Sequence, residues 1–419
     1  MAMESTGCVV AGGGPAGLML GLLLARAGVR VTVVEKHADF LRDFRGDTVH
    51  PSTVRLIDEL GLGEEFRRLP QSKLRSVVLP VPGGPPVTLG DFGLLKPPYD
   101  YIAMMPQWDF LNFLAAAAAE EPGFTLLMSH SATGLIRDGG RVRGIRLRRP
   151  DGGEEDLRAD LVVATDGRHS ALRAAAGLAP VEFPVPFDTW WFRLPRHAEE
   201  AGEMAGLIPA LGPGEALIAL NRTDYYQIAY LAPKGADARI RAEGVEGFRR
   251  RIAALRPDLA DRVDAIGSLD DLHWLDVRLD RLRSWHLNGL LCIGDAAHAM
   301  SPAGGVGINL AIQDAVAAAK LLAPALLRGT VSAEDLEKVE RRRRPPTVIV
   351  QTAQRLMHRA IFGPVMAGKR TRIPGIVILL ARRLPAIRGL MPRLIGFGPL
   401  PEHAPAFARR AGASPQARA

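Results

Sequence analysis

Three short segments contain the residues with the clearest chemical potential. In each, glycines or a carboxylate follow an apolar run, so backbone N–H groups and carboxylate oxygens become available to a ligand. A glycine-rich loop alone is common, but three such segments in this order predict a site for a dinucleotide. The segments are GGGPAG at 12–17, ATDGRHSALR at 164–173 and GDAAHAMSPAGGVGIN at 294–309.

The first segment lies in the context that a dinucleotide site requires. The apolar run 8–11 predicts a buried parallel strand, and leucines after Gly17 predict a helix. Gly12 allows a tight turn, Gly14 lets the backbone approach a pyrophosphate, and Gly17 lets the helix pack on the strand. The candidate cofactor-binding residues of this loop are Gly12, Gly14, Pro15, Ala16 and Gly17.

A second strand, predicted over 31–34, ends in an acid. Glu35 lies 18 residues after Gly17, close to the roughly 20 expected for the carboxylate that binds an adenosine ribose. We assign Glu35 and the adjacent Lys36 to the candidate cofactor site.

The second segment follows a predicted strand over 160–164. Ligands of open α/β sheets bind beyond the carboxyl ends of the strands, which is where this order places Asp166. Its carboxylate can accept hydrogen bonds from sugar hydroxyls. An acid–glycine turn after a strand is also common as a plain turn.

The third segment is the most specific. A predicted strand over 290–293 leads to Asp295, and a glycine loop then opens a long apolar helix at Asn309. The N-terminus of a helix favours negative charge, which suits the anionic edge of a reduced flavin. His298 is either a structural residue of this loop or a catalytic acid or base. The candidate flavin-binding residues here are Asp295, Pro302, Gly305, Val306, Gly307, Ile308 and Asn309.

With these motifs the sequence resembles the group A flavoprotein monooxygenases, the para-hydroxybenzoate hydroxylase-like family. The resemblance covers roughly residues 6–345, and its motifs match 12–17, 166–170 with Arg173, and 294–298 with the loop that follows. One departure is Val306, where the family often has glutamine. The resemblance implies FAD as cofactor and NADH or NADPH as co-substrate.

The resemblance also implies roles for residues outside the three motifs. Arg45 and Gly46 match the family's arginine segment near the pyrophosphate and the ring, and arginine suits a pyrophosphate because its fork donates two hydrogen bonds. Gln107 matches a polar residue at the ribityl–phosphate region, although it could equally cap a helix or face solvent. His50 is a candidate general base, or a loop residue before Pro51.

The expected fold class is α/β: a doubly wound FAD-binding layer, an interleaved smaller sheet-containing substrate domain and a helical C-terminal segment. We expect the FAD-binding layer at 1–71, 105–180 and 280–345, the substrate domain at 72–104 and 181–279, and the C-terminal segment at 346–419. Tyr225 and Gln227 are candidate catalytic residues on one face of a predicted strand, with Tyr226 on the other. The pattern leaves open which face meets the substrate.

The implied reaction is hydroxylation of an aromatic or polyketide-like small molecule by O2, through a flavin hydroperoxide. Alternatives of the same fold are a flavin-dependent reductase, a quinone- or prenyl-ring oxygenase, and a non-catalytic binder of lipids or partners. A halogenase is disfavoured because Trp190–Pro195 lacks the second tryptophan of the halogenase signature. No metal-binding residues are assigned.

The net charge of +8 is unevenly distributed, since the segment from Lys338 onward holds 17 Lys/Arg against 2 Asp/Glu. The run Arg341–Arg344 is expected to close a helix, with Pro345 and Pro346 stopping it. The basic segment is either a helical cover or a peripheral membrane contact. Nucleic-acid binding is not expected, because its basic residues are not interleaved with stacking aromatics. Cys8 and Cys292 are expected to be buried thiols, not a disulfide. The expected compartment is therefore the reducing cytoplasm.

Overall fold

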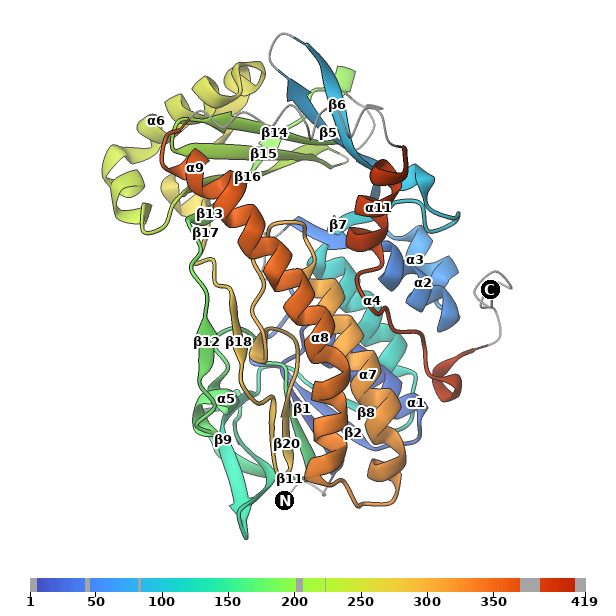
Figure 1. The fold of residues 1–419 in the computed structure, drawn as a ribbon. Coiled ribbons are helices and arrows are strands. Elements are labelled where there is room, and N and C mark those ends of the chain that lie inside the picture. Colours follow the sequence, from blue (N-terminus) through green and yellow to red (C-terminus); the bar gives the residue numbers. More distant parts are fainter. Residues whose placement is uncertain are drawn as a thin grey trace.

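A computed structural model describes residues 6–41, 46–81, 84–200, 206–222, 224–369 and 385–410. Two sheets dominate it. One lies among helices α1, α4 and α7 in the lower half of Figure 1, and the other lies at the top under α6. The long helix α8 runs from the first region towards the second. These helices are α1 (Pro15–Arg26), α4 (Gln107–Ala119), α6 (Asp237–Leu255), α7 (Gly307–Leu327) and α8 (Ala333–Met357).

The lower sheet has a parallel core that brings distant segments together. Its parallel strands lie in the order β20, β11, β1, β2, β8, with β19 at one edge and an antiparallel β9–β10 extension on β11. Ala11 is paired with Ala164, and Ala164 with Cys292. All three motif-bearing loops therefore leave the sheet at one edge. The strands are β1 (Thr6–Ala11), β2 (Val31–Val34), β8 (Phe124–Leu127), β9 (Ser131–Asp138), β10 (Arg141–Arg148), β11 (Glu154–Ala164), β19 (His286–Leu287) and β20 (Leu290–Cys292).

The expected α/β fold is confirmed by these elements. The run 8–11 is fully buried in β1, and α1 begins at Pro15 with Gly14 as its N-cap. Helix α7 is long and apolar enough to cross a membrane, the single such helix in the described part of the chain. Because 78% of its apolar window is buried inside the protein, it has the character of a core helix.

The upper sheet contains seven strands in the order β17, β13, β16, β15, β14, β5, β6. One face packs on α6, where the ring of Tyr230 contacts Phe248 of the helix and Trp190 of the neighbouring strand. The opposite face carries Trp191, whose cross-strand partner is Ala229. The strands are β5 (Ser76–Val81), β6 (Gly84–Asp91), β13 (Phe187–Pro195), β14 (Gly206–Gly212), β15 (Glu215–Asn221), β16 (Tyr225–Pro233) and β17 (His273–Leu275).

Short elements connect the two sheets. A three-stranded sheet in the order β3, β7, β4 lies between them, and β12 pairs with β18. The remaining elements are β3 (Gly46–Val49), α2 (Pro51–Glu59), α3 (Gly63–Arg68), β4 (Ser72–Leu74), η1 (Phe92–Leu94), β7 (Ile102–Pro106), α5 (Ala171–Ala175), β12 (Pro180–Glu182), η2 (Ala198–Glu200), η3 (Pro257–Ala265), η4 (Leu269–Asp271), β18 (Asp280–Leu282), η5 (Gly294–Ala296), η6 (His358–Phe362), α9 (Gly363–Met366), α11 (Pro385–Gly396) and η7 (Ala406–Ala408).

The expectation that Pro345 and Pro346 stop a helix is wrong, because α8 continues through both to Met357. Prolines remove backbone donors and normally break a helix. Here the two prolines take donors from the carbonyls of Arg341 and Arg342, and both of these residues are exposed, so water can bind the carbonyls instead. One buried face then anchors both halves of the helix to the protein; it carries Arg343, Thr347, Gln351 and Gln354.

The C-terminal segment packs back on the lower region, in agreement with its interpretation as a cover. The ring of His50 is 2.8 Å from the carbonyl of Ile395. The carboxylate of Glu59 accepts the Ala404 N–H at 2.7 Å. Buried groups of α2 therefore depend on residues almost 350 positions later in the chain.

Truncation after Pro345 tests how far this segment completes the core. We expect the truncated protein to be insoluble or unfolded, because it loses the second half of α8, with its buried Thr347 and Gln351, and the partner of Glu59. Removal of residues 411–419 is the control and is expected to leave the melting temperature within a few degrees. A truncated protein that is soluble with a wild-type circular dichroism spectrum would contradict this expectation.

Candidate functional site

A cavity of about 750 Å³ opens where the three motif loops converge. Its opposite wall includes Trp191 of β13 and Trp274 of β17, so the cavity lies between the two sheets. Thr48, Thr165 and Met300, which the motif analysis did not single out, also line it. The sequence-predicted residues that line it are Gly12, Gly14, Pro15, Ala16, Glu35, Lys36, Gln107, Asp166, Asp295, Pro302, Gly305, Gly307 and Ile308.

The glycines of the first loop have separable roles. Gly12 has φ +115°, and a Cβ there would lie 2.4 Å from the carbonyl oxygen of Thr165. A Cβ on Gly17 would lie 1.9 Å from the carbonyl oxygen of Gly12. At Gly14 no heavy atom of the described residues comes within 4 Å of a Cβ. Gly12 and Gly17 are thus required by packing, whereas Gly14 keeps space open in the cavity wall.

Glu35 accepts a hydrogen bond from the backbone of the first loop. Its Oε2 accepts the Gly13 N–H at 2.9 Å, and its Oε1 accepts the His37 N–H at 3.0 Å. The side chain is buried, whereas the adjacent Lys36 is exposed. The predicted carboxylate therefore lies at the cavity and also orders the glycine loop.

Asp166 places a carboxylate in the wall of the cavity. Its Oδ2 accepts the Leu172 N–H at 3.2 Å, while its buried Oδ1 has no hydrogen-bond partner among the described residues. Burial raises the pKa of Asp166, because removal from water disfavours the charged form. An unsatisfied acceptor in a cavity wall is costly unless a ligand or water donates to it.

Two arginines join the second and third loops. Arg173 donates to the carbonyl of Ala296 at 3.2 Å and to that of Arg168 at 2.7 Å. Arg168 in turn lies 3.7 Å from the carboxylate of Asp295. These contacts fix Asp166 and Asp295 relative to each other on adjacent strand ends.

The third loop is pinned to β3. Thr48 donates through its hydroxyl to the Gly305 carbonyl at 2.8 Å. Helix α7 begins at Gly307, two residues before the expected start, with Val306 at its N-cap. The start of α7 faces the cavity through Gly307 and Ile308, as a site for an anionic edge requires.

Asn309 and Gly17 support the loops from behind the cavity wall. The amide oxygen of Asn309 accepts the His50 N–H at 2.9 Å and the Thr53 hydroxyl at 2.8 Å. Its Nδ2 donates to the Thr48 carbonyl at 3.1 Å. Asn309 therefore connects the third loop to β3 and α2. Neither Asn309 nor Gly17 lines the cavity. Arg45 lies outside the described residues, and Gly46 begins β3.

His50 does not lie in the cavity. It is fully buried, its Nδ1 is 2.8 Å from the Ile395 carbonyl, and burial lowers its pKa to about 4. A general base must reach the substrate, and His50 in this position cannot. Its role is to hold the C-terminal segment against α2. A pattern of residue types carries no information on which loop histidine the C-terminal segment will cover.

The register of the upper sheet answers which face Tyr225 and Gln227 occupy. Gln227 is paired with Arg193, two residues from Trp191, so all three share the face that bounds the cavity. The guanidinium of Arg193 lies 4.5 Å from the ring centroid of Tyr225 and 5.5 Å from that of Trp108. Tyr225 and Gln227 therefore lie beyond the described cavity wall but on the same side of the sheet.

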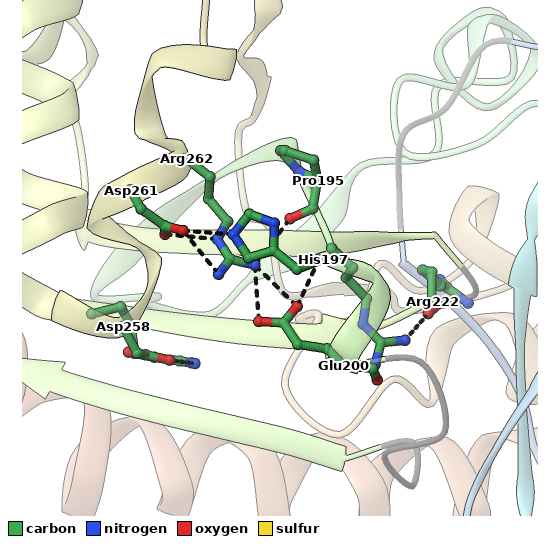
Figure 2. A network of polar contacts seen from close by, with 9 residues as sticks. Pro195, His197, Glu200, Arg222, Asp258, Asp261 and Arg262 are labelled. Carbon is green, nitrogen blue, oxygen red and sulfur yellow. Dashed lines mark hydrogen bonds and ion pairs between the residues drawn. The ribbon is translucent and has the colours of Figure 1, made fainter.

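A polar network holds the end of this sheet (Figure 2). Arg262 contacts both carboxylate oxygens of Glu200 at 3.0 Å and bonds to Asp261 and the Pro195 carbonyl. Asp261 also lies 2.6 Å from the ring of His197. Nearby, Arg222 donates twice to the amide oxygen of Gln227, at 3.1 and 2.8 Å. The network joins the end of β13 to the η3 segment, and Arg222 fixes the side chain of Gln227 on β16.

Substitution of Gly14 by alanine tests whether this glycine is needed for cofactor binding or for folding. We expect Gly14→Ala to fold with a melting temperature near that of the wild type but to bind FAD at least about tenfold more weakly, because its methyl group enters the cavity. Gly134→Ala is the matched control, since that glycine also has open space around its Cβ and lies in β9. Equal FAD affinity in both variants would show that the cofactor does not approach Gly14.

The lowered pKa of His50 predicts a stability effect in acid. Its folded-state pKa is about 4, below the unfolded value near 6.5, so the neutral ring stabilises the fold above pH 6.5. This contribution is lost as the pH falls from about 6.5 towards 4. We expect His50→Gln to lose less stability than the wild type between pH 7 and pH 5 in urea unfolding, while it retains FAD. Parallel losses in the two proteins would contradict the burial of a neutral ring.

Comparisons with known proteins agree with this site. A family model described as FAD binding domain matches residues 5–354. The 6-methylpretetramide 4-monooxygenase of Streptomyces rimosus is 36% identical over 92% of this chain and 91% of its own length. Para-nitrophenol 4-monooxygenase of a Pseudomonas species is 26% identical over 80% and 83%.

Solved structures of flavoenzymes share the fold of this chain. The anhydrotetracycline hydroxylase of Streptomyces rimosus superposes with a TM-score of 0.72 at 25% identity, covering 94% of this chain and 76% of that one. A myxobacterial halogenase superposes with a TM-score of 0.71 at 19% identity over 97% and 99%, which shows the shared fold alone. The chain belongs to the FAD-binding-domain family of flavoprotein monooxygenases and is an FAD-dependent monooxygenase.

Proposed function

We propose that this enzyme uses NADH or NADPH and O2 to hydroxylate a planar aromatic, polyketide-like small molecule. The observation that carries the proposal is the position of the cavity: cofactor loops form one wall, and the other includes the aromatic residue Trp191 of β13 beside residues of β17. Relatives named for 6-methylpretetramide, anhydrotetracycline and para-nitrophenol support an aromatic substrate.

The cofactor wall fits FAD residue by residue. Gly14 and the start of α1 would take the pyrophosphate, Glu35 the adenosine ribose, and Asp166 a hydroxyl of the ribityl chain. The start of α7 would receive the anionic edge of the ring. Gln107 lines the cavity and would contact the ribityl–phosphate region. Bound FAD supplies the redox chemistry that activates O2, and these residues bind and orient it.

Arg45 and Gly46 complete the proposed cofactor set. They precede Thr48, which lines the cavity and holds the Gly305 carbonyl, so the chain passes close to the third loop here. The contributions of Pro302, Gly305 and Gly307 would come from the backbone. The replacement of the family's usual glutamine by Val306 therefore leaves this part of the site intact.

The substrate wall combines apolar area with a polar end. Trp191 offers a flat surface, and aromatic side chains favour offset or edge contacts with aromatic ligands. Further along the same face, Tyr225 and Gln227 can hydrogen-bond to a phenol or carbonyl group. We assign these two residues to substrate orientation. Closure of the wall over the cavity would also exclude water from the reacting oxygen species.

Two further suggestions stay predictions. In α11 the side chains of Leu390, Met391 and Leu394 are exposed beside Arg393, which is compatible with a peripheral membrane contact. A cytoplasmic location is also expected.

A pair of tyrosines tests the substrate wall with a matched control. Tyr225→Phe removes a hydroxyl from the cavity-side face, whereas Tyr226→Phe removes one from the face that packs on α6. With an aromatic polyketide as substrate, we expect kcat/KM to fall about fivefold in Tyr225→Phe and about twofold or less in Tyr226→Phe, since one hydrogen bond contributes roughly 1 kcal/mol. FAD affinity should be unchanged in both. A larger loss in Tyr226→Phe would place the substrate on the other face.

A further inference from the structure

A buried ionic cluster links the C-terminal segment to the third cofactor loop. We call the four residues His298, Asp314, Arg343 and Glu402 the Asp314 cluster. Each is at most 4% exposed, yet none lines the cavity. They come from the loop after β20, from α7, from α8 and from the chain after α11, so four separate segments meet there.

Asp314 binds both ends of the short turn that leads to the cavity, at Gly294 and at His298. Its Oδ2 accepts the Gly294 N–H at 3.1 Å and lies 2.6 Å from Nε2 of His298. Gly294 has φ +58° and begins the turn that carries Asp295 into the cavity wall. Burial opposes ionisation of Asp314, but His298 and Arg343 outweigh it and hold the pKa of Asp314 below its ordinary value. A charged acceptor makes a stronger hydrogen bond to the Gly294 N–H.

Arg343 connects Asp314 to the end of the chain. Its Nε donates to Oδ1 of Asp314 at 3.0 Å, and its Nη1 lies 3.3 Å from the Leu400 carbonyl and 3.5 Å from the Glu402 carboxylate. Glu402 also binds Arg342 at 2.7 Å, and its N–H donates to Gln313, the neighbour of Asp314 on α7. The guanidinium thus joins α7 to a segment more than 80 residues later.

Stability alone gives a weak account of this arrangement. Burying charges costs solvation free energy, and apolar replacements of buried ion pairs are often as stable. What such a cluster supplies well is a defined geometry, because each charged group is held by several partners at short distances. Here the last contact of the cluster is the hydrogen bond from the Gly294 N–H to Asp314, and Gly294 lines the cavity of the proposed cofactor site.

We propose that Asp314 is a positioning residue for FAD, and that Arg343 with the Leu400–Glu402 stretch fixes the orientation of Asp314. This inference rests on the proposed cofactor site. Its consequence is thermodynamic linkage: docking of the C-terminal segment raises the affinity for FAD, and FAD strengthens the docking by the same factor.

The test is a charge-balanced double variant, Arg343→Met/Glu402→Gln, which removes one positive and one negative charge. The control is Arg68→Met/Glu64→Gln, the same change at an exposed pair on α3. Three quantities are measured on full-length protein: the Kd for FAD by titration of the apoprotein, the visible absorption band of bound FAD, and amide exchange in a peptide that contains Gly294.

We expect the double variant to raise the Kd about tenfold, shift the visible band and speed exchange at Gly294, while the control matches the wild type. A lowered melting temperature with wild-type Kd, spectrum and exchange would overturn the inference and leave the cluster a structural one. If the double variant does not fold, Arg343→Lys, which keeps the charge, should change the same three quantities in the same direction; an unchanged Kd and spectrum there would equally overturn it. Failure of the wild type to bind FAD would instead refute the proposed function.

Discussion

The site depends on the parallel pairing of β1, β11 and β20. Because Ala11, Ala164 and Cys292 are aligned across the three strands, three loops separated by well over 100 residues in sequence leave the sheet at the same level. A shift of one residue in either pairing would turn every side chain of that strand to the other face. The residues aligned across all three strands are apolar and fully buried, so the sheet lies inside the protein and the loops at its carboxyl end reach the cavity.

Each loop then meets its neighbour through contacts that permit little movement. Gly12 lies directly against Thr165, and Arg173 reaches from the second loop to the carbonyl of Ala296. The third loop is held from β3 by Thr48 and from α7 by Asp314. A ligand therefore meets donors and acceptors that are already in position, which lowers the ordering cost of binding. The seven-stranded sheet adds an aromatic wall opposite, with its own polar network at one end.

The sequence predicted those parts of the structure that local chemistry determines. Glycines needed for close approach, a carboxylate after a strand and a proline at the first turn of α1 all act within a few residues. Other features depended on distant contacts. Helix α8 continues through Pro345 because buried side chains on both sides of it, among them Val339 and Gln351, pack on the protein. His50 is buried because Ile395 covers it.

The same reasoning explains the residues that the motifs misplaced or missed. Asn309 belongs to the third motif, but its amide binds three groups of the β3–α2 region and does not face the cavity. Glu402 lies in a segment whose composition indicates a basic cover or a membrane contact, yet it joins the Asp314 cluster. A carboxylate's partner across 60 or more residues cannot be found from spacing, since the path of the chain decides it.

The most direct test of the account is turnover of the purified protein with FAD, NADH or NADPH and isotope-labelled O2, with an aromatic polyketide as substrate. The account predicts a product that carries one labelled oxygen atom, formed in proportion to the reduced nicotinamide consumed. Consumption of the nicotinamide that no aromatic compound changes, with the label recovered only in hydrogen peroxide or water, would contradict it.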